Sequence, residues 1–182
     1  ITGLLERIDR GASKKFIIEE VKSDTDFFEL DQKGSRVVIR GNNSVSIATG
    51  LNWYLKYYAG IHLSWNGMTA TLPDVLPPVM KKERHETKLP WRYDLNYCTY
   101  SYSMAFWDWE RWEKEIDWMA LHGINLPLAI TGTETVWYNV LQKLGYNKTE
   151  IDEFISGPGF FAWWLMNNLE GWGGPNPDHW YT

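Results

Sequence analysis

The alternation of extended and helical patterns from residue 91 onward constrains the fold of this 182-residue chain most. A strand-like run at 91–99 precedes an amphipathic helical pattern at 109–121. The apolar run 124–130 then predicts a buried strand, and residues 134–144 predict the next helix. Strand, helix, strand, helix in this order is typical of the start of a parallel α/β sheet or barrel. Because two parallel strands cannot be covered on both faces, and the pattern is unfinished at Thr182, we expect a fragment of a larger domain.

The first part of the chain predicts a small α/β layer domain, with strands around one long helix. Residues 45–58 show the 3.6-residue period of an amphipathic helix, and Gly60 follows them. The proline-containing segment 66–90 predicts a linker or an extended crossing segment, and not an element of its own. We therefore expect a small N-terminal α/β domain at 1–80 and an incomplete second domain at 81–182. The other elements predicted in the first part are a helix at 2–10 and strands at 15–19, 27–30, 36–40 and 61–65.

Charge is divided unevenly along the chain. Residues 1–85 carry 12 Lys+Arg and 10 Asp+Glu, whereas residues 86–182 carry 6 and 13, for net charges of +2 and −7. An acidic second part argues against binding to nucleic acid or to an anionic membrane surface. A single cysteine, Cys98, excludes an internal disulfide framework and a cysteine-based zinc site. No run approaches the roughly 20 apolar residues of a membrane span, and Ile1 in place of Met is consistent with a removed leader.

Aromatic residues are concentrated in the second part. All of the twelve tryptophans except Trp53 and Trp65 lie from Trp91 onward, among Asn, Thr, Ser and acidic residues. This mixture suits a pocket that is apolar and hydrogen-bonding at once, as the C–H face and hydroxyl rim of a sugar require. The alternative is a Trp-rich core or a subunit interface, which composition alone favours.

Two candidate clusters follow the two predicted strands of the second part. Strand alternation would place Asn96 and Cys98 on one side, where an amide can bind a sugar hydroxyl or an acetamido group. A buried amide that anchors the backbone beside a space-filling thiol is an equally good interpretation. The second cluster is the loop at 131–133, which contains Thr133, together with Glu134 at the start of the next helix and Trp137 one turn later. Helix capping is the stronger interpretation of Glu134, and ligand contact is the alternative.

The remaining motifs give weaker evidence for a functional site. Trp163 and Trp164 follow a rigid Gly-Pro-Gly turn, so one of them could stack on a ligand while the other packs in the core. The acidic residues at 108–117 have the spacing of a solvated helix face, with Glu110 and Lys114 as an i,i+4 pair, and not of a catalytic carboxylate pair. The four histidines lack ligand spacing, so no metal and no cofactor is expected.

Long runs of this sequence resemble glycoside hydrolase family 89, the alpha-N-acetylglucosaminidases. The runs are 92–103, 107–121, 123–126, 157–163 and, in the first part, 50–58. The resemblance implies a small N-terminal α/β domain followed by the first β/α repeats of a truncated (β/α)₈ TIM barrel, with the rest of the barrel and a helical domain beyond. It implies exo-acting, retaining release of terminal alpha-linked N-acetylglucosamine. The two catalytic glutamates would lie on later strands, so no catalytic residue is expected here.

The resemblance also implies which residues contact the sugar and where the enzyme works. Asn96, Cys98 and Trp163 map onto the family's sugar pocket, whereas Thr133 stands where the animal enzymes have glutamine. The expected partner is an N-acetylglucosamine-terminated glycan of heparan or mucin type, with no nucleic acid and no membrane. The expected location is the secretory pathway, periplasmic or extracellular in a bacterium and lysosomal in an animal.

Two other classes of function remain to be compared with this one. A non-catalytic carbohydrate-binding module would also be rich in aromatics, but such modules are commonly all-β sandwiches, and the second part of this chain is predicted to be helical. A structural interaction domain would use its tryptophans at an interface.

Overall fold

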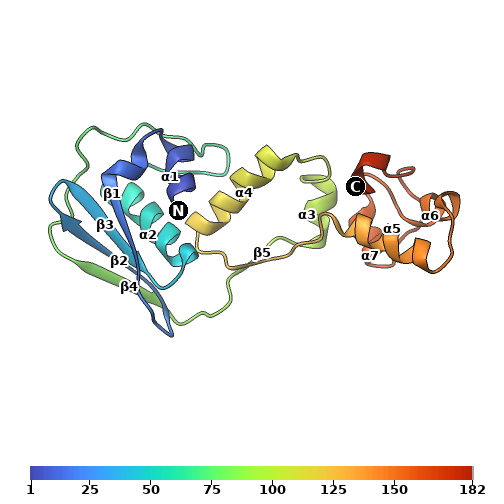
Figure 1. Ribbon diagram of the computed structural model, residues 1–182, viewed down its shortest axis with the longest axis horizontal. Helices are drawn as coiled ribbons and strands as arrows, with labels where there is room; N and C mark the ends of the chain where they lie inside the picture. The colour runs from blue at the N-terminus through green and yellow to red at the C-terminus, as the bar shows by residue number, and fades with distance from the viewer. Residues whose placement is uncertain (182) are drawn as a thin grey trace. The chain divides into compact units, whose positions relative to one another are not determined.

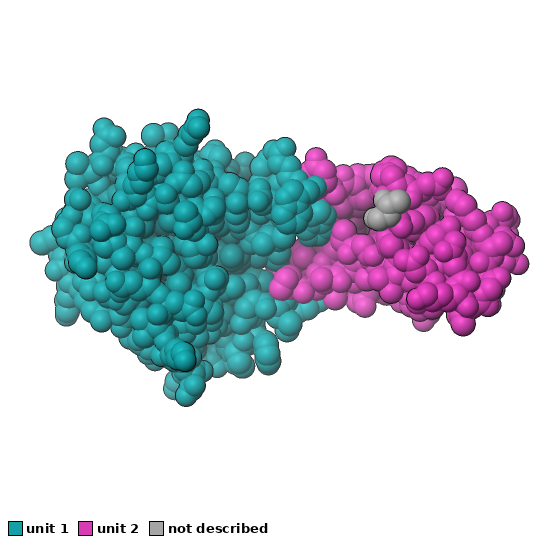
Figure 2. Space-filling view, in the orientation of Figure 1, with its two compact units in different colours: residues 1–93, 109–126 teal, residues 94–108, 127–182 magenta. Residues whose placement is uncertain are grey.

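The computed structural model describes residues 1–181 as two compact units. Unit 1 comprises residues 1–93 and 109–126, and unit 2 comprises residues 94–108 and 127–182 (Figure 2). Both contain helices, and unit 1 contains a four-stranded sheet (Figure 1). The predicted mixed α/β class is confirmed.

The sheet of unit 1 has the strand order β1-β3-β2-β4. Strands β1 (Phe16–Glu20) and β3 (Arg36–Gly41) are parallel, and β2 (Asp26–Lys33) is antiparallel to β3. These three strands confirm the predicted runs. The edge strand β4 (Glu83–Thr87) is antiparallel to β2, so the prediction that 66–90 contains no element is wrong.

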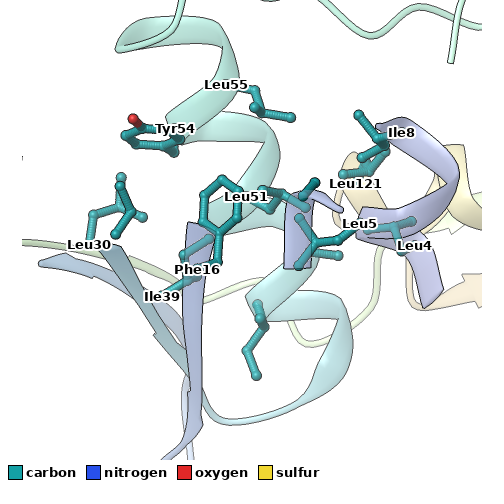
Figure 3. Packing of buried hydrophobic residues seen from close by; sticks show 14 of the residues in the cluster. Leu4, Leu5, Ile8, Phe16, Leu30, Ile39, Leu51, Tyr54, Leu55 and Leu121 are labelled. Carbon is teal, nitrogen blue, oxygen red and sulfur yellow. The ribbon is translucent and has the colours of Figure 1, made fainter. Parts of the chain in front are cut away.

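Helix α2 (Ser44–Tyr57) covers the inner face of this sheet, and its apolar stripe forms the core with α1 (Thr2–Ile8) and the short 3₁₀ helix η1 (Ala12–Lys15). Asn43 caps α2, since its side chain accepts a hydrogen bond from Ser46 N at 2.8 Å. Figure 3 shows buried side chains of this core gathered between the sheet and the helices; the labelled ones are Leu4, Leu5, Ile8, Phe16, Leu30, Ile39, Leu51, Tyr54, Leu55 and Leu121.

The outer face of the sheet carries alternating charges across its four strands. Paired positions bring Glu19, Arg40, Glu29 and Arg84 into one row. Arg40 Nε lies 2.5 Å from Glu19 Oε2, and Arg84 Nη1 lies 3.2 Å from Glu29 Oε1. Opposite charges on neighbouring strands stabilise the pairing, and they explain how the charged segment at 83–87 joins the sheet.

Residues 61–65 do not form the predicted strand. Ser64 makes only an isolated bridge with Gly67. The indole Nε1 of Trp65 donates a hydrogen bond to Glu115 Oε2 at 2.6 Å, and this ties the segment to α4 (Trp109–Leu121). The segment is therefore fixed by a side-chain contact and not by a strand ladder.

Helix α4 buries one of the acidic residues that were predicted to lie on a solvated face, Glu115. Trp109 is 69% exposed and Ile116 46% exposed, whereas Glu115 and Met119 are buried. The Glu115 carboxylate accepts hydrogen bonds from Trp65 and from Arg111 Nη2, the latter at 3.0 Å. These partners offset the cost of burying a charged group. The prediction that Glu115 lies on a solvated face is therefore wrong. The predicted pair Glu110–Lys114 is confirmed at 2.9 Å.

Two short strands follow the sheet of unit 1. They are β5 (Tyr93–Asp94) and β6 (Leu126–Pro127). Leu126 N donates to Arg92 O and Leu128 N donates to Asp94 O, so the two strands run in the same direction. The predicted strands at 91–99 and 124–130 were too long, and Leu126 is exposed where a buried strand was expected.

Unit 2 consists mainly of helices. Helix α5 confirms the helix predicted at 134–144, and Asn147 caps α6 through a capping box with Glu150. Its apolar cluster is formed by Leu141, Ile151, Ile155, Phe161 and Trp164. The elements are α3 (Tyr97–Tyr102), α5 (Thr133–Lys143), α6 (Lys148–Phe154), α7 (Phe161–Leu165) and the 3₁₀ helix η2 (Asp178–Tyr181).

Candidate functional site

Unit 2 contains a cavity of about 460 Å³ with a largely aromatic and apolar wall. Its lining comes from α3, the loop before α4, the turn before α5, the start of α7, and η2. Such a cavity with a few polar groups is typical of a small-molecule site. The apolar lining includes Tyr100, Met104, Phe106, Trp107, Ile130, Phe161 and Trp180. The polar lining includes Ser101, Asp108, Thr131, Glu134 and His179.

Asn96 marks the point where the chain turns from β5 into α3. Its side chain accepts a hydrogen bond from Thr99 N at 3.1 Å, and Thr99 Oγ1 accepts one from Asn96 N at 3.3 Å. This capping box begins a helix where a strand was predicted, so strand alternation does not relate Asn96 to Cys98. Asn96 is exposed, and its Nδ2 has no hydrogen-bond partner among residues 1–181.

Cys98 lies in the first turn of α3 and is exposed, with no disulfide partner among the described residues. Tyr100, two residues later, is buried, and its hydroxyl donates to Leu128 O just after β6. This contact fixes the far side of α3 to the chain that follows the second strand. The first turn, with Asn96 and Cys98, remains accessible.

Helices α3 and α7 are joined by two contacts. Ser101 Oγ accepts a hydrogen bond from Ala162 N at 3.3 Å. The rings of Tyr102 and Trp163 meet edge to face with centroids 5.1 Å apart. Trp163 is half-buried, whereas Trp164 is buried against Phe161. The interpretation that at least one of the two tryptophans packs in the core is confirmed for Trp164.

The turn before α5 positions Glu134. Gly132 adopts a left-handed conformation with φ of 87°, and Thr133 Oγ1 donates to Ile130 O at 2.7 Å. Glu134 is half-buried and lines the cavity. Burial raises the pKa of its carboxyl, although hydrogen bonds from the backbone N–H groups of Glu134 and Gly132 offset part of this increase.

Trp137 lies away from the large cavity. It lines a second recess of about 120 Å³, where its ring meets Trp164 edge to face at 5.2 Å. Of the six residues that the sequence nominated, only Glu134 lines the large cavity. Asn96, Cys98 and Trp163 instead lie on the connected helices α3 and α7, which both contribute other residues to its wall.

Several cavity residues were not nominated from the sequence. Phe106 and Trp180 meet with centroids 6.2 Å apart, and Asp108 and His179 add polar groups. The density of aromatics was a signal for the whole region. No local pattern distinguished Phe106 or Trp180 from the tryptophans that pack elsewhere, because 74 residues separate them and the fold brings them together.

Neither a metal site nor a membrane span was found within residues 1–181. They contain no group of three or more His, Cys, Asp or Glu side chains placed to hold a metal ion. No helix in the same range is long and apolar enough to cross a membrane.

Comparisons with known proteins identify both parts of the chain. Residues 92–182 match the family model of the alpha-N-acetylglucosaminidase TIM-barrel domain, and residues 1–78 match that of the alpha-N-acetylglucosaminidase N-terminal domain. Human alpha-N-acetylglucosaminidase is 46% identical over 161 residues, which cover 88% of this chain and 22% of the human protein.

Solved structures of family 89 enzymes have the same fold as this chain. A family 89 glycoside hydrolase from Clostridium perfringens in complex with 2-acetamido-1,2-dideoxynojirmycin gives a TM-score of 0.92 at 40% identity. A doubly substituted enzyme from the same organism, in complex with its substrate GlcNAc-alpha-1,4-galactose, gives a TM-score of 0.93 at 42% identity. Each match covers 99% of this chain and 21% of the other, so the chain spans about a fifth of the length of these relatives. The chain belongs to the alpha-N-acetylglucosaminidase family, glycoside hydrolase family 89.

Proposed function

We propose that this chain is the N-terminal part of an enzyme that releases terminal alpha-linked N-acetylglucosamine from glycans. The observation that carries the proposal is the TM-score of 0.93 to a relative bound to GlcNAc-alpha-1,4-galactose. The reaction adds water across the glycosidic bond and yields free N-acetylglucosamine and the alcohol of the remaining glycan. A retaining mechanism needs two carboxylates, and both would come from parts of the enzyme outside this chain.

We further propose that residues 1–80 form a small N-terminal domain and residues 81–182 begin a (β/α)₈ barrel. The two family matches divide the chain between residues 78 and 92, near this boundary. The parallel direction of β5 and β6, each followed by helices, supports the barrel. In such barrels the loops after the strands hold the ligand, and only two residues separate the end of β5 from the start of α3.

Asn96, Cys98 and Trp163 are proposed to contact the N-acetylglucosamine ring. The Nδ2 group of Asn96 is available to donate a hydrogen bond. Cys98, the second residue of α3, is exposed. Trp163 supplies an aromatic ring that can pack on the apolar face of a sugar. All three lie on α3 and α7 or at their ends, and the contact of Tyr102 with Trp163 joins these helices.

Thr133, Glu134 and Trp137 are proposed as further substrate contacts. Glu134 is the best placed of the three, since it lines the large cavity. Thr133 already donates its hydroxyl hydrogen to Ile130 O, so its oxygen can act only as an acceptor for the substrate. Trp137 contacts Trp164 at the second recess, which would make it a contact for a more distant part of the glycan.

The glycan is proposed to be of heparan or mucin type, and the enzyme to act in the secretory pathway. Its compartment would be the lysosome in an animal, and the periplasm or the extracellular space in a bacterium.

Hydrolysis of an aryl alpha-N-acetylglucosaminide by the full-length enzyme tests the proposal. We expect turnover of the alpha anomer, no turnover of the beta anomer, and the alpha anomer of N-acetylglucosamine as the first product in proton NMR. The 182-residue chain alone should be inactive. Turnover by the chain alone would show that the catalytic carboxylates are within it, and no turnover by the full-length enzyme would contradict the proposed activity.

A further inference from the structure

We propose that Tyr100 is a positioning residue for the hydrolysis, and that its hydroxyl fixes Asn96 and Cys98 in the orientation in which they contact the sugar. The inference rests on the proposed function, in which these two residues contact N-acetylglucosamine. Tyr100 is buried, whereas Asn96 and Cys98 are exposed at the start of the same helix, α3. The effect of the hydroxyl is therefore transmitted by the backbone of α3.

Leu128, in the segment after β6, holds both ends of the stretch that contains Asn96 and Cys98. Its backbone N–H donates a hydrogen bond to Asp94 O, at the end of β5, at 3.0 Å. Its carbonyl oxygen accepts a hydrogen bond from the Tyr100 hydroxyl. Asp94 precedes Asn96 by two residues and Tyr100 follows it by four, so one residue anchors the chain on both sides of the proposed sugar contacts.

The backbone between these two anchors is strained. Leu95 has a φ of 71°, in the left-handed region that few residues other than glycine adopt. Its N–H donates to Asp94 Oδ1 at 2.7 Å, and Asn96, the next residue, begins the capping box of α3. A left-handed leucine persists only where the surrounding structure restrains it, and such residues are concentrated at ligand-binding and active sites. The two hydrogen bonds of Leu128 supply this restraint.

Helix α3 needs tertiary contacts of this kind. It has six residues, and a helix of that length is not stable by itself in water. Two contacts fix its last turn to α7: the hydrogen bond from Ala162 N to Ser101 Oγ, and the ring contact between Tyr102 and Trp163. The Tyr100 hydroxyl adds a link to a different segment, the one that follows β6.

Tyr100→Phe in the full-length enzyme tests the role, because it removes the hydroxyl and keeps the buried ring. We expect KM for an aryl alpha-N-acetylglucosaminide to rise by about fivefold to tenfold, as for the loss of one hydrogen bond, and kcat to stay unchanged. The reason is that the sugar must restore the geometry of its contact residues as it binds. Tyr146→Phe removes the hydroxyl of an exposed tyrosine in the turn between α5 and α6 and is the matched control.

The division between KM and kcat separates positioning from a merely structural role. If Tyr100→Phe only reduced the amount of folded enzyme, kcat per total protein would fall and KM would keep its wild-type value. That result, or an unchanged KM with an unchanged kcat, would overturn the proposal.

A double-mutant cycle shows whether Tyr100 acts through Asn96. Asn96→Asp keeps the oxygen that accepts from Thr99 N and caps α3, but removes the Nδ2 donor. Residues that act through one another have non-additive effects. Tyr100→Phe should therefore raise KM by a smaller factor in the Asn96→Asp background than in the wild type. The same factor in both backgrounds would overturn the assignment of Asn96 as the residue that is positioned.

Leu95→Gly gives a second, independent test, because glycine adopts the left-handed conformation without strain. The turn then no longer depends on the anchors at Leu128. Combined with Leu95→Gly, Tyr100→Phe should raise KM by a smaller factor than it does alone. An equal factor would overturn the link between the strained turn and the Tyr100 hydroxyl.

The outcome also separates this inference from the proposed function. Hydrolysis by the wild type with an unchanged KM in Tyr100→Phe would leave the glycosidase activity standing and remove the positioning role. Absence of hydrolysis by the wild type would overturn the proposed activity, and with it the role of Tyr100.

Discussion

Arg92 Nη2 lies 2.6 Å from Asp26 Oδ2 and joins the start of β2 to the chain just before β5. Asp26 also accepts hydrogen bonds from Asn42 Nδ2 at 2.9 Å and Asn43 Nδ2 at 2.8 Å. Arg92 in turn donates to Gly123 O, at the end of α4. One carboxylate therefore holds together the sheet, the N-terminus of α2 and the two segments that lead into β5 and β6.

The Asp26→Asn variant should destabilise the chain by about 1.5–3 kcal/mol at pH 7, because it removes charge-assisted hydrogen bonds. Burial raises the pKa of Asp26, but the hydrogen bonds from Asn42 and Arg92 outweigh this, so the pKa is lowered overall. A lowered pKa contributes stability above the unfolded pKa, and that stability is lost as the pH falls through the folded pKa.

Urea unfolding of wild type and variant at pH 7 and at pH 3 measures this effect. The difference in unfolding free energy should shrink at the lower pH. Asp24→Asn, at an exposed position on the same segment, is the control and should change little at either pH. A difference that persists unchanged at pH 3 would mean that the charge of Asp26 does not stabilise the junction.

Gly50 lies where α2 packs most closely on the sheet. A Cβ atom there would be 3.0 Å from Ile39 Cγ2 and 3.0 Å from Phe28 Cβ. Gly50→Ala should therefore destabilise the chain by about 1–3 kcal/mol through overpacking, although alanine favours a helix by about 0.5–1 kcal/mol. Gly3→Ala, on the exposed side of α1, would place its Cβ 3.2 Å from Nη1 of Arg7, a partly exposed side chain that is ion-paired with Glu113, and should cost less stability than Gly50→Ala. Thermal unfolding of both variants gives the comparison, and equal midpoints would contradict the close packing.

Glu134 should give the opposite dependence on pH from Asp26. Burial raises the pKa of Glu134, so ionisation is less favourable in the folded state and stability declines as the pH rises through the folded pKa. Glu134→Gln has no charge to bury, and its unfolding midpoint in urea should therefore increase relative to wild type between pH 4 and pH 8. The exposed Glu153→Gln is the matched control. A relative midpoint that falls with rising pH would show that ionised Glu134 is stabilised by its surroundings.

Much of unit 1 could be predicted from local pattern, because its strands and α2 carry regular periods and clear boundaries. Strand β4 was missed because its charged residues do not show the apolar alternation of a strand, and Glu29, which pairs with Arg84 across the sheet, lies 55 residues earlier in the chain. The burial of Glu115 on α4 was also missed. One of the hydrogen bonds that allow Glu115 to be buried comes from Trp65, 50 residues earlier in the chain. Contacts over such a distance leave no local pattern in the sequence.

In the candidate functional site, local sequence patterns were again insufficient to predict contacts between distant segments. Asn96 was nominated on a strand, but its capping box with Thr99 begins α3 there, and the N-x-x-T spacing of the cap was the signal available in the sequence. The turn before α5 was predicted correctly, since Gly132 and the residues after it have the composition of a helix start. The cavity wall formed by Phe106 and Trp180 could not be predicted, because it depends on how separate segments pack.

Trp163 tests the central claim, that this chain forms the wall of the sugar pocket. Its ring rests edge to face against Tyr102 and is half-buried, so it is fixed in place with part of its surface accessible. Trp172→Ala, at a tryptophan that is 60% exposed and lines neither recess, is the control.

The decisive measurement is the inhibition constant of N-acetylglucosamine for the full-length enzyme. Trp163→Ala should raise it by roughly 5- to 150-fold, equivalent to about 1–3 kcal/mol of lost binding, and Trp172→Ala should leave it unchanged. An inhibition constant for Trp163→Ala equal to that of the wild type would place Trp163 in the core and contradict the account.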